Sequence, residues 1–225
     1  MGDLLERIAA RCEMTELLWN LKAWLELPVP LGSHLASTRL ELLGFVLAVV
    51  MVLCNIRVNP WAWPLAIVSS LVYALLFWQS KLYGESGLQI FFVVMALWGW
   101  WQWLRGTQVA GQPLVVSHMK HAARLWALTA FFVFWVVLAQ LLHRATNTDV
   151  PWWDAATTSG SIVATWLLAR KHVENWPTWV AVNAVSVGLF VYKQLWLTSA
   201  LYAVFLVLAV VGWRAWQRLA QPQGV

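Results

Sequence analysis

Residues 63–103 read WPLAIVSSLVYALLFWQSKLYGESGLQIFFVVMALWGWWQW, and residues 176–216 read WPTWVAVNAVSVGLFVYKQLWLTSALYAVFLVLAVVGWRAW. The second stretch follows the first at a constant offset of 113 positions and without a gap. Both begin with Trp-Pro, end with Gly-Trp-x-x-Trp and enclose two apolar segments. This shared register indicates an internal duplication, in which each half of the chain is a copy of one helical unit.

The composition of the 225-residue chain places it in a lipid bilayer. Hydrophobic residues make up 61% and charged residues 11%, which is more apolar surface than a soluble domain can bury. Many of the 19 Trp residues stand at the ends of apolar runs, as rings at a membrane–water interface do. The net charge of +5 fits basic cytoplasmic loops, and no basic cluster interleaved with aromatic residues predicts nucleic-acid binding.

Seven apolar runs are close to the roughly 20 residues that a helix needs to cross a bilayer. These runs are 38–56, 62–79, 86–104, 124–143, 152–169, 176–192 and 198–216. The duplication assigns three runs to each copy and leaves one between them, which restores the direction of the second copy. The sequence therefore predicts an all-α integral membrane protein with two parallel three-helix repeats joined by a central helix, a 3+1+3 arrangement. Its expected segments are the first repeat at 38–104, a loop and linker helix at 105–143, and the second repeat at 152–217.

The N-terminal segment, residues 1–30, has a different pattern. Apolar and acidic side chains alternate with helical spacing up to Leu27, where prolines and a glycine interrupt the pattern. Asp3 and Glu6 stand where a cleavable signal peptide would carry basic residues. We therefore expect an amphipathic helix that lies on the membrane surface or docks on the bundle.

Sequence signatures of an enzyme are absent. The chain has no recognisable Ser-His-Asp frame, no HExxH motif, no P-loop and no paired intramembrane carboxylates. Its two cysteines, Cys12 and Cys54, have neither metal-ligand nor redox spacing, and its five histidines fall in predicted loops or at helix ends. We expect no catalytic activity, no metal and no cofactor.

Uncharged polar and aromatic side chains inside the apolar runs are the candidate substrate contacts. Trp179 and Asn183 share one helix face, and an amide at that depth must find a partner, either another helix or a substrate. In the duplicated register Ser70 corresponds to Asn183, and Gln89 corresponds to Tyr202, so both copies offer polar groups at similar depth. The candidate substrate-binding residues are Asn183, Gln89, Trp179, Tyr202, Tyr73, Gln79 and Ser186.

Four charged residues stand at helix ends on one side of the predicted bundle. Glu41 and Asp154 are equivalent under the duplication, and Lys81 and Lys193 end the neighbouring helices. We interpret them as interfacial ion pairs or a gate rather than a proton relay. No charged residue is left deep within a predicted helix, which argues against proton-coupled pumping.

The motifs resemble those of the PnuC family of bacterial nicotinamide riboside transporters over about residues 38–218. In the first half these motifs are Asn59-x-Trp61-x-Trp63-Pro64, Phe77-Trp78-Gln79-x-Lys81-Leu82-Tyr83-Gly84, Leu88-Gln89 and Gly99-Trp100-x-x-Trp103. In the second half they are Glu174-Asn175-Trp176-x-x-Trp179, Asn183, Tyr192-Lys193, Leu197-Thr198, Leu201-Tyr202 and Gly212-Trp213-x-x-Trp216. The resemblance implies a fold related to the SWEET sugar transporters, facilitated diffusion of nicotinamide riboside, trapping by cytoplasmic phosphorylation, and a homo-oligomer such as a trimer.

Two alternatives remain open at this point. The resemblance implies that transporters with the same fold can carry thiamine or riboflavin instead, and a non-transporting membrane scaffold or sensor is a third possibility. The resemblance implies the bacterial inner membrane. The expected cytoplasmic side carries the basic residues Arg57, Arg105, Lys120, Arg124, Arg170, Lys171, Arg214 and Arg218. Because cytoplasmic loops are rich in Lys and Arg, we expect the C-terminus in the cytoplasm and the N-terminus outside.

Overall fold

The computed structural model describes residues 27–30, 36–79, 83–107, 111–145, 149–194 and 196–220. Most of the expected amphipathic N-terminal helix, residues 1–26, lies outside this set. The chain forms two compact units, residues 1–46 and residues 47–225. The first unit contains a short antiparallel pair, β1 (Pro28–Pro30) with β2 (Ala36–Thr38), in which Val29 lies opposite Ser37.

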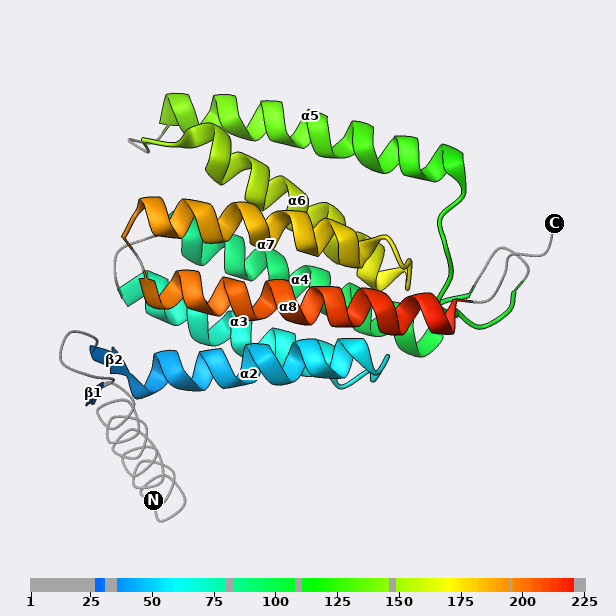
Figure 1. Cartoon of the computed structure of the whole chain (residues 1–225), viewed down its shortest axis with the longest axis horizontal. Helices are drawn as coiled ribbons and strands as arrows, with labels where there is room; N and C mark the ends of the chain where they lie inside the picture. Colours follow the sequence, from blue (N-terminus) through cyan, green and yellow to red (C-terminus); the bar gives the residue numbers. More distant parts are fainter. Residues whose placement is uncertain are drawn as a thin grey trace, which may run out of the picture. The chain divides into compact units, whose positions relative to one another are not determined.

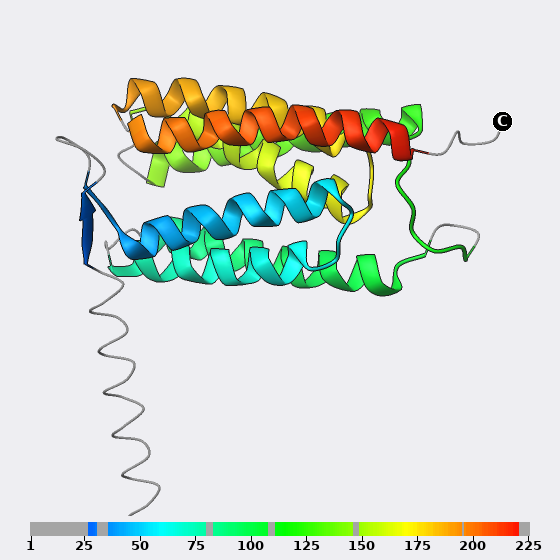
Figure 2. The ribbon, with the colours of Figure 1, turned by 60° about the horizontal axis from the view of Figure 1, so that its bottom comes forward.

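Seven helices follow β2 in the described part of the chain, and each covers one of the predicted apolar runs. They are α2 (Arg39–Ile56), α3 (Ala62–Gln79), α4 (Tyr83–Arg105), α5 (His121–Ala145), α6 (Pro151–Ala169), α7 (Asn175–Tyr192) and α8 (Trp196–Leu219). Helices α3 to α8 run roughly along one direction (Figures 1 and 2). The predicted all-α class is confirmed, since a three-residue strand pair is the extent of sheet in the described residues.

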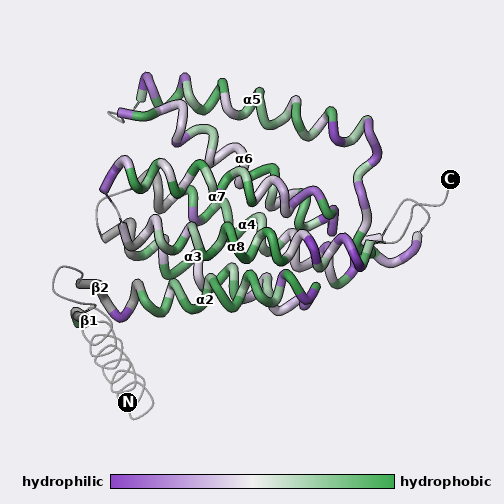
Figure 3. The backbone as a smooth tube through the Cα atoms, viewed as in Figure 1, coloured by the Kyte–Doolittle hydropathy of each residue, from purple (hydrophilic) through white to green (hydrophobic). Residues whose placement is uncertain are grey.

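The helices carry the apolar surface that a bilayer requires. Three of them contain spans long and apolar enough to cross a membrane, Gly87–Arg105, His121–Ala145 and Thr198–Leu219, and two shorter apolar spans are Leu42–Ile56 and Ala62–Leu75. Helix α5 is apolar along most of its length (Figure 3), and Trp126 and Val137 on it are 75% and 61% exposed. Such side chains are stable in contact with lipid but not with water. The chain is therefore an integral membrane protein.

The two copies have the same internal packing. Helix α3 packs against α4 in the first copy, and α7 packs against α8 in the second. In each pair a glycine makes room for a tryptophan, because a Cβ added to Gly99 would lie within 2.6 Å of the Trp63 ring, and one added to Gly212 within 2.6 Å of the Trp176 ring. Since these positions are related by the 113-residue offset, the duplication seen in the sequence is also present in the structure.

Equivalent backbone conformations also end the first helix of each copy. Val58 after α2 has φ 54°, and Lys171 after α6 has φ 55°. Such left-handed conformations are uncommon for residues other than glycine, and they commonly terminate helices. Pro64 and Pro177 then occupy the third positions of α3 and α7, where the absent N–H has no intrahelical partner to lose.

The core of the second unit lies at one end of the helix bundle, near the C-terminal ends of α2, α4, α6 and α8. We call this the basic end, because the exposed Arg57, Arg105 and Arg218 lie there. Its buried residues include Trp63, Trp103, Trp176 and Trp216, and Trp216 is fully buried. Helix α5 packs against α6, and α6 packs against both α7 and α4, so α6 connects the linker helix to both copies.

Candidate functional site

The middle of α7 carries two buried polar side chains. Asn183 is 4% exposed and Ser186 is 3% exposed, and they lie nearly one turn apart on the same helix. Among the described residues neither side chain makes a hydrogen bond, although buried amides are nearly always paired. The Asn183 amide therefore has donors and an acceptor to offer to a ligand.

Aromatic residues flank this polar pair along α7 and α8. Trp179, one turn before Asn183, is half-buried and packs against the core at the basic end. Tyr202 on α8 is half-buried and stacks on Phe190 of α7, with ring centroids 5.0 Å apart and an interplanar angle of 36°. Four of the predicted contacts, Trp179, Asn183, Ser186 and Tyr202, therefore lie on the packed pair α7 and α8.

The predicted contacts of the first copy lie on α3 and α4. Tyr73 and Gln89 are both half-buried, and Gln79 is the last residue of α3, with a side chain outside the described set. Among the described residues no hydrogen bond joins Gln89 to Asn183. The assignment of these first-copy residues to a substrate site stays a prediction.

The charged residues at the opposite end of the bundle are only partly described. Lys193 Nζ lies 3.8 Å from Asp154 Oδ2 and 3.8 Å from Asp149 Oδ1. These side chains are all more than a quarter exposed, and ion pairs of this kind contribute little to stability. Glu41 lies in α2 with its side chain outside the described set, and Lys81 is also outside it, so the role of the four residues as a gate is not tested.

A cavity of about 460 Å³ lies between α5, α6 and α7. Its lining is mostly apolar, including Phe131, Val163 and Val182, and the polar exceptions are Arg124, Thr157, Glu174 and Thr178. None of the predicted substrate contacts lines it, because Val182 and Val185 belong to a different face of α7 from Asn183. The cavity is therefore not the predicted substrate site.

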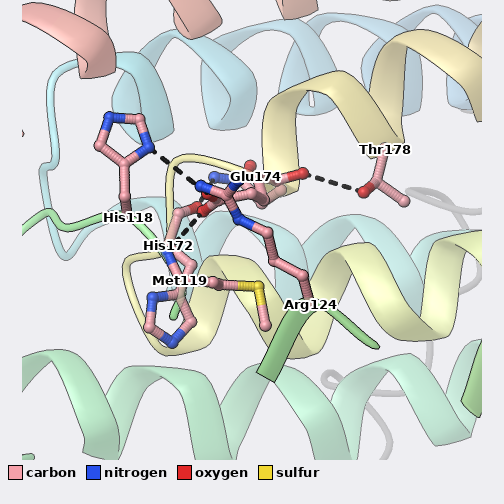
Figure 4. Close-up of polar contacts among 7 residues, drawn as sticks. His118, Met119, Arg124, His172, Glu174 and Thr178 are labelled. Carbon is pink, nitrogen blue, oxygen red and sulfur yellow. Dashed lines mark hydrogen bonds and ion pairs between the residues drawn. The ribbon is translucent and has the colours of Figure 1, made fainter. Parts of the chain in front are cut away.

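A carboxylate at the basic end ties the linker to the second copy (Figure 4). Glu174 Oε2 accepts a hydrogen bond from the Met119 backbone N–H at 3.1 Å, and Glu174 Oε1 lies 2.7 Å from Arg124 Nη2 and 3.4 Å from His118 Nδ1. Thr178 Oγ1 donates to the Glu174 carbonyl at 2.9 Å. The sequence does not indicate this role of Glu174, since nothing local points to partners 50 or more residues away.

The loop between α6 and α7 is more buried than its composition indicates. The sequence predicts His172 in a loop or at a helix end, and the structure places it in the α6–α7 loop. Its side chain is half-buried there, and its Nδ1 has no partner among the described residues. Burial lowers the pKa of His172, Arg170 lowers it further, and Glu174 and a backbone hydrogen bond with Ser117 oppose the shift. Burial also lowers the pKa of Lys171, whose Nζ donates to the Leu114 carbonyl at 2.9 Å.

The polar groups in the middle of α7 are suited to binding a ligand. Among the described residues no group of three His, Cys, Asp or Glu side chains lies close enough to hold a metal ion. The polar side chains in the middle of α7 are an amide and a hydroxyl, which bind neutral polar groups.

Comparison with known proteins shows the family of the chain. A family model described as nicotinamide mononucleotide transporter matches residues 38–218. The riboflavin/roseoflavin transporter RibM of Streptomyces davaonensis is 31% identical over 178 residues, which cover 78% of this chain and 83% of RibM. The nicotinamide riboside transporter PnuC of Escherichia coli is 28% identical over 182 residues, covering 70% of this chain and 76% of PnuC.

A solved structure has the same fold. The crystal structure of the vitamin B3 transporter PnuC matches with a TM-score of 0.66 and 22% sequence identity, and the match covers 80% of this chain and 81% of that one. At this sequence identity, the structural similarity is evidence of a shared fold only. The family match over most of the chain is the evidence of homology. The chain therefore belongs to the nicotinamide mononucleotide transporter family and is an integral membrane transporter of the PnuC type.

Proposed function

We propose that this chain mediates facilitated diffusion of nicotinamide riboside across a bacterial inner membrane. The observation that carries the proposal is the family match over residues 38–218, together with relatives that are named nicotinamide riboside transporters. The C-terminus and the basic end face the cytoplasm in this proposal, the protein functions as a homo-oligomer such as a trimer, and no catalytic step occurs on the chain. Phosphorylation in the cytoplasm would then trap the substrate.

The side chains on α7 and α8 suit this ligand. The cationic pyridinium ring can stack between aromatic faces such as those of Trp179 and Tyr202, where the ring quadrupole attracts a cation. The Asn183 amide can pair with the carboxamide, and Ser186 with a ribose hydroxyl. Gln89, Tyr73 and Gln79 would complete the site from the first copy.

The phosphate-free riboside fits better than the mononucleotide for which the family model is named. Helices α3 and α7 contain no charged residue, and the charges of the other described helices lie within two turns of a helix end. A phosphate in the middle of the bundle would therefore have no Arg or Lys partner, and burying it unpaired is costly. Rejection of the phosphorylated form would also prevent the trapped product from leaving.

Riboflavin is the second candidate, because RibM shares 31% identity with this chain. Its isoalloxazine ring could stack on the same aromatic faces, but it carries no positive charge to gain from them. Thiamine, an aromatic cation, is the third candidate.

Calorimetric titration of the purified protein in detergent tests the proposal. The four ligands would be nicotinamide riboside, nicotinamide mononucleotide, riboflavin and thiamine. Saturable binding of the riboside alone would support the assignment. Saturable binding of riboflavin alone would be compatible with the family assignment and would contradict nicotinamide riboside as the substrate. Absence of binding by all four ligands would favour a non-transporting scaffold or sensor.

A further inference from the structure

Four buried indoles form a continuous chain across the basic end. The ring centroids of Trp63 and Trp103 are 5.5 Å apart, those of Trp103 and Trp216 are 6.1 Å apart, and those of Trp216 and Trp176 are 5.6 Å apart. The two outer contacts are nearly perpendicular, at 87° and 82°, and lie within one copy each. The Trp103–Trp216 contact joins the two copies.

Each of the two central indoles also donates a hydrogen bond to a helix of the opposite copy. Trp103 Nε1 on α4 donates to the Leu168 carbonyl at 3.1 Å, in the last turn of α6 in the second copy. Trp216 Nε1 on α8 lies 3.1 Å from the Asn55 carbonyl and 3.2 Å from the Ile56 carbonyl, in the last turn of α2 in the first copy. Asn55 and Leu168 are related by the 113-residue offset, so each copy holds the end of the other's first helix.

The outer indoles do not contribute such bonds. Trp63 Nε1 and Trp176 Nε1 are buried and have no hydrogen-bond partner among the described residues. Of the four indoles, Trp103 and Trp216 therefore make the hydrogen bonds between the copies, while Trp63 and Trp176 pack beside them.

The α4–α6 contact and the α2–α8 contact differ in the number of polar interactions that they contain. On the α4–α6 side, Arg170 Nη1 also donates to Gln102 Oε1 at 3.1 Å, and Lys171 Nζ lies 5.2 Å from the centroid of the Trp103 ring. The equivalents of Gln102 and Lys171 are Ala215 and Val58, which can form neither contact. The α2–α8 side is thus held by fewer polar contacts than the α4–α6 side.

We propose that the four tryptophans are a gate that is closed at the basic end, and that it opens on the α2–α8 side while the α4–α6 side acts as the hinge. This inference rests on the proposed transport function, because a substrate bound between the copies can leave only where they separate. All four tryptophans are at most 7% exposed, so the cluster is tightly packed in this state. Opening requires the Trp216 hydrogen bond to break, and the additional contacts of Gln102 and Lys171 keep α4 and α6 together.

Distances between paired spin labels test the proposal without any ligand. One pair, Leu53→Cys with Arg218→Cys, spans α2 and α8, and its equivalent, Trp166→Cys with Arg105→Cys, spans α4 and α6. All four positions are exposed. Cys12→Ser and Cys54→Ala remove the native thiols, and the protein is reconstituted as the full chain in lipid.

The decisive variant is Trp216→Phe, which keeps a ring and removes the donor. It should increase the population of a longer α2–α8 distance about fivefold to tenfold, the effect of one net hydrogen bond, and leave the α4–α6 distance unchanged. The matched control is Trp63→Phe, which removes an indole nitrogen that has no partner and should change neither distance. Equal effects of both variants, or no effect of Trp216→Phe, would overturn the gate.

A second variant covers the possibility that Trp216→Phe does not fold. Gln102→Ala gives α4 the residue that α8 already has at this position, so the α4–α6 distance should broaden towards that of the α2–α8 pair. No broadening would overturn the hinge. Uptake into liposomes is a separate test: if no ligand binds even the unaltered protein, the proposed function fails while the distance result still stands.

Discussion

Asn183 is the side chain on which substrate recognition depends most directly in the proposed site. It is buried in the middle of α7 without a hydrogen-bond partner among the described residues. Asn183→Leu should lower affinity for the riboside by at least about tenfold, because two or more ligand hydrogen bonds are lost. Leucine is a good helix former and is compatible with a membrane helix, so the variant should still fold. Titration calorimetry measures this loss.

The matched control for this variant is Ala184→Leu, which adds the same side chain to an exposed face of the same helix. It should leave both affinity and folding unchanged. Full affinity of Asn183→Leu would remove Asn183 from the site and make it a helix-packing residue instead.

Gly99 and Gly212 set how closely α4 and α8 approach their neighbours. Gly212→Ala would place a Cβ within 2.6 Å of three atoms of the Trp176 ring, and overpacking of this kind costs about 1–3 kcal/mol. The variant should lower the thermal unfolding midpoint of the detergent-purified protein. Gly188→Ala in α7, where nothing lies within 4 Å of the added Cβ, should keep or raise the midpoint.

His172 gives the protein a pH-dependent stability. Its pKa is lowered below the ordinary 6.5 on folding, so the unfolded chain binds the proton more tightly than the folded one. Stability should therefore be fully present above about pH 7 and be lost as pH falls through the window below 6.5. Unfolding midpoints measured between pH 5 and 8 should show this slope, and His172→Gln should flatten it.

The exposed His121 at the start of α5 provides the comparison for this measurement. His121→Gln should keep the pH dependence of the unaltered protein. A slope that survives in His172→Gln and disappears in His121→Gln would reverse the assignment.

At the scale of elements, Glu174 determines where α5 begins relative to α7. Its carboxylate contacts the Met119 backbone and the side chain of Arg124, and it is 19% exposed. Glu174→Ala should leave the Met119 N–H without its acceptor, and hydrogen exchange at that amide should accelerate about tenfold, the effect of one charge-assisted hydrogen bond. Mass spectrometry of the peptide around residues 114–124 measures the exchange.

Asp149→Asn is the contrasting variant, because Asp149 is 62% exposed and lies 3.8 Å from Lys193. An ion pair of that kind contributes little, so exchange near residue 149 and overall stability should hardly change. If Glu174→Ala also leaves exchange at Met119 unchanged, the linker is held by the backbone pairing of Ser117 with the α6–α7 loop instead.

The helices could be predicted because their signals are local. Apolar runs bounded by polar residues placed all seven to within a few residues of their observed ends, and the 113-residue offset anticipated that Gly99 and Gly212 would have equivalent surroundings. The roles of Glu174, Trp103 and Trp216 could not be predicted, since their partners lie between 50 and 161 positions away in the chain. The short strand pair before α2 was also unforeseen, because Pro28 and Pro30 predict an interruption of structure rather than a strand.

At the scale of the whole molecule, the duplication explains why the two copies exchange contacts. The same tryptophan, placed by the same Gly-Trp-x-x-Trp motif, reaches the end of the first helix in the opposite copy on both sides. A parallel repeat of this kind gives two similar bundles around one axis, and a site between them can be exposed to either side by small rotations. Departures from symmetry, such as Gln102 opposite Ala215, then decide which side moves.

The proposed facilitated diffusion makes a prediction about the energetics of transport, because the middle of the described helices carries no charge. Helices α3 and α7 contain no Asp, Glu, Lys, Arg or His, and the charges of the other described helices lie within two turns of a helix end. The proposed facilitated diffusion therefore involves no proton carried with the substrate. A cationic riboside would then cross with its own single charge, and the membrane potential alone would set its final distribution. At 100 mV, inside negative, this corresponds to about 2.3 kcal/mol, or roughly fiftyfold accumulation.

Proteoliposomes with a potassium diffusion potential test this prediction. Nicotinamide riboside should accumulate about fiftyfold at 100 mV and equilibrate at a ratio of one when the potential is zero, whatever the pH gradient. Neutral riboflavin, if it were the substrate, should reach a ratio of one under both conditions, so the same measurement separates the two candidates. Accumulation driven by a pH gradient at zero potential would contradict facilitated diffusion and would require a proton-binding group that the described helices do not place at the bilayer midplane.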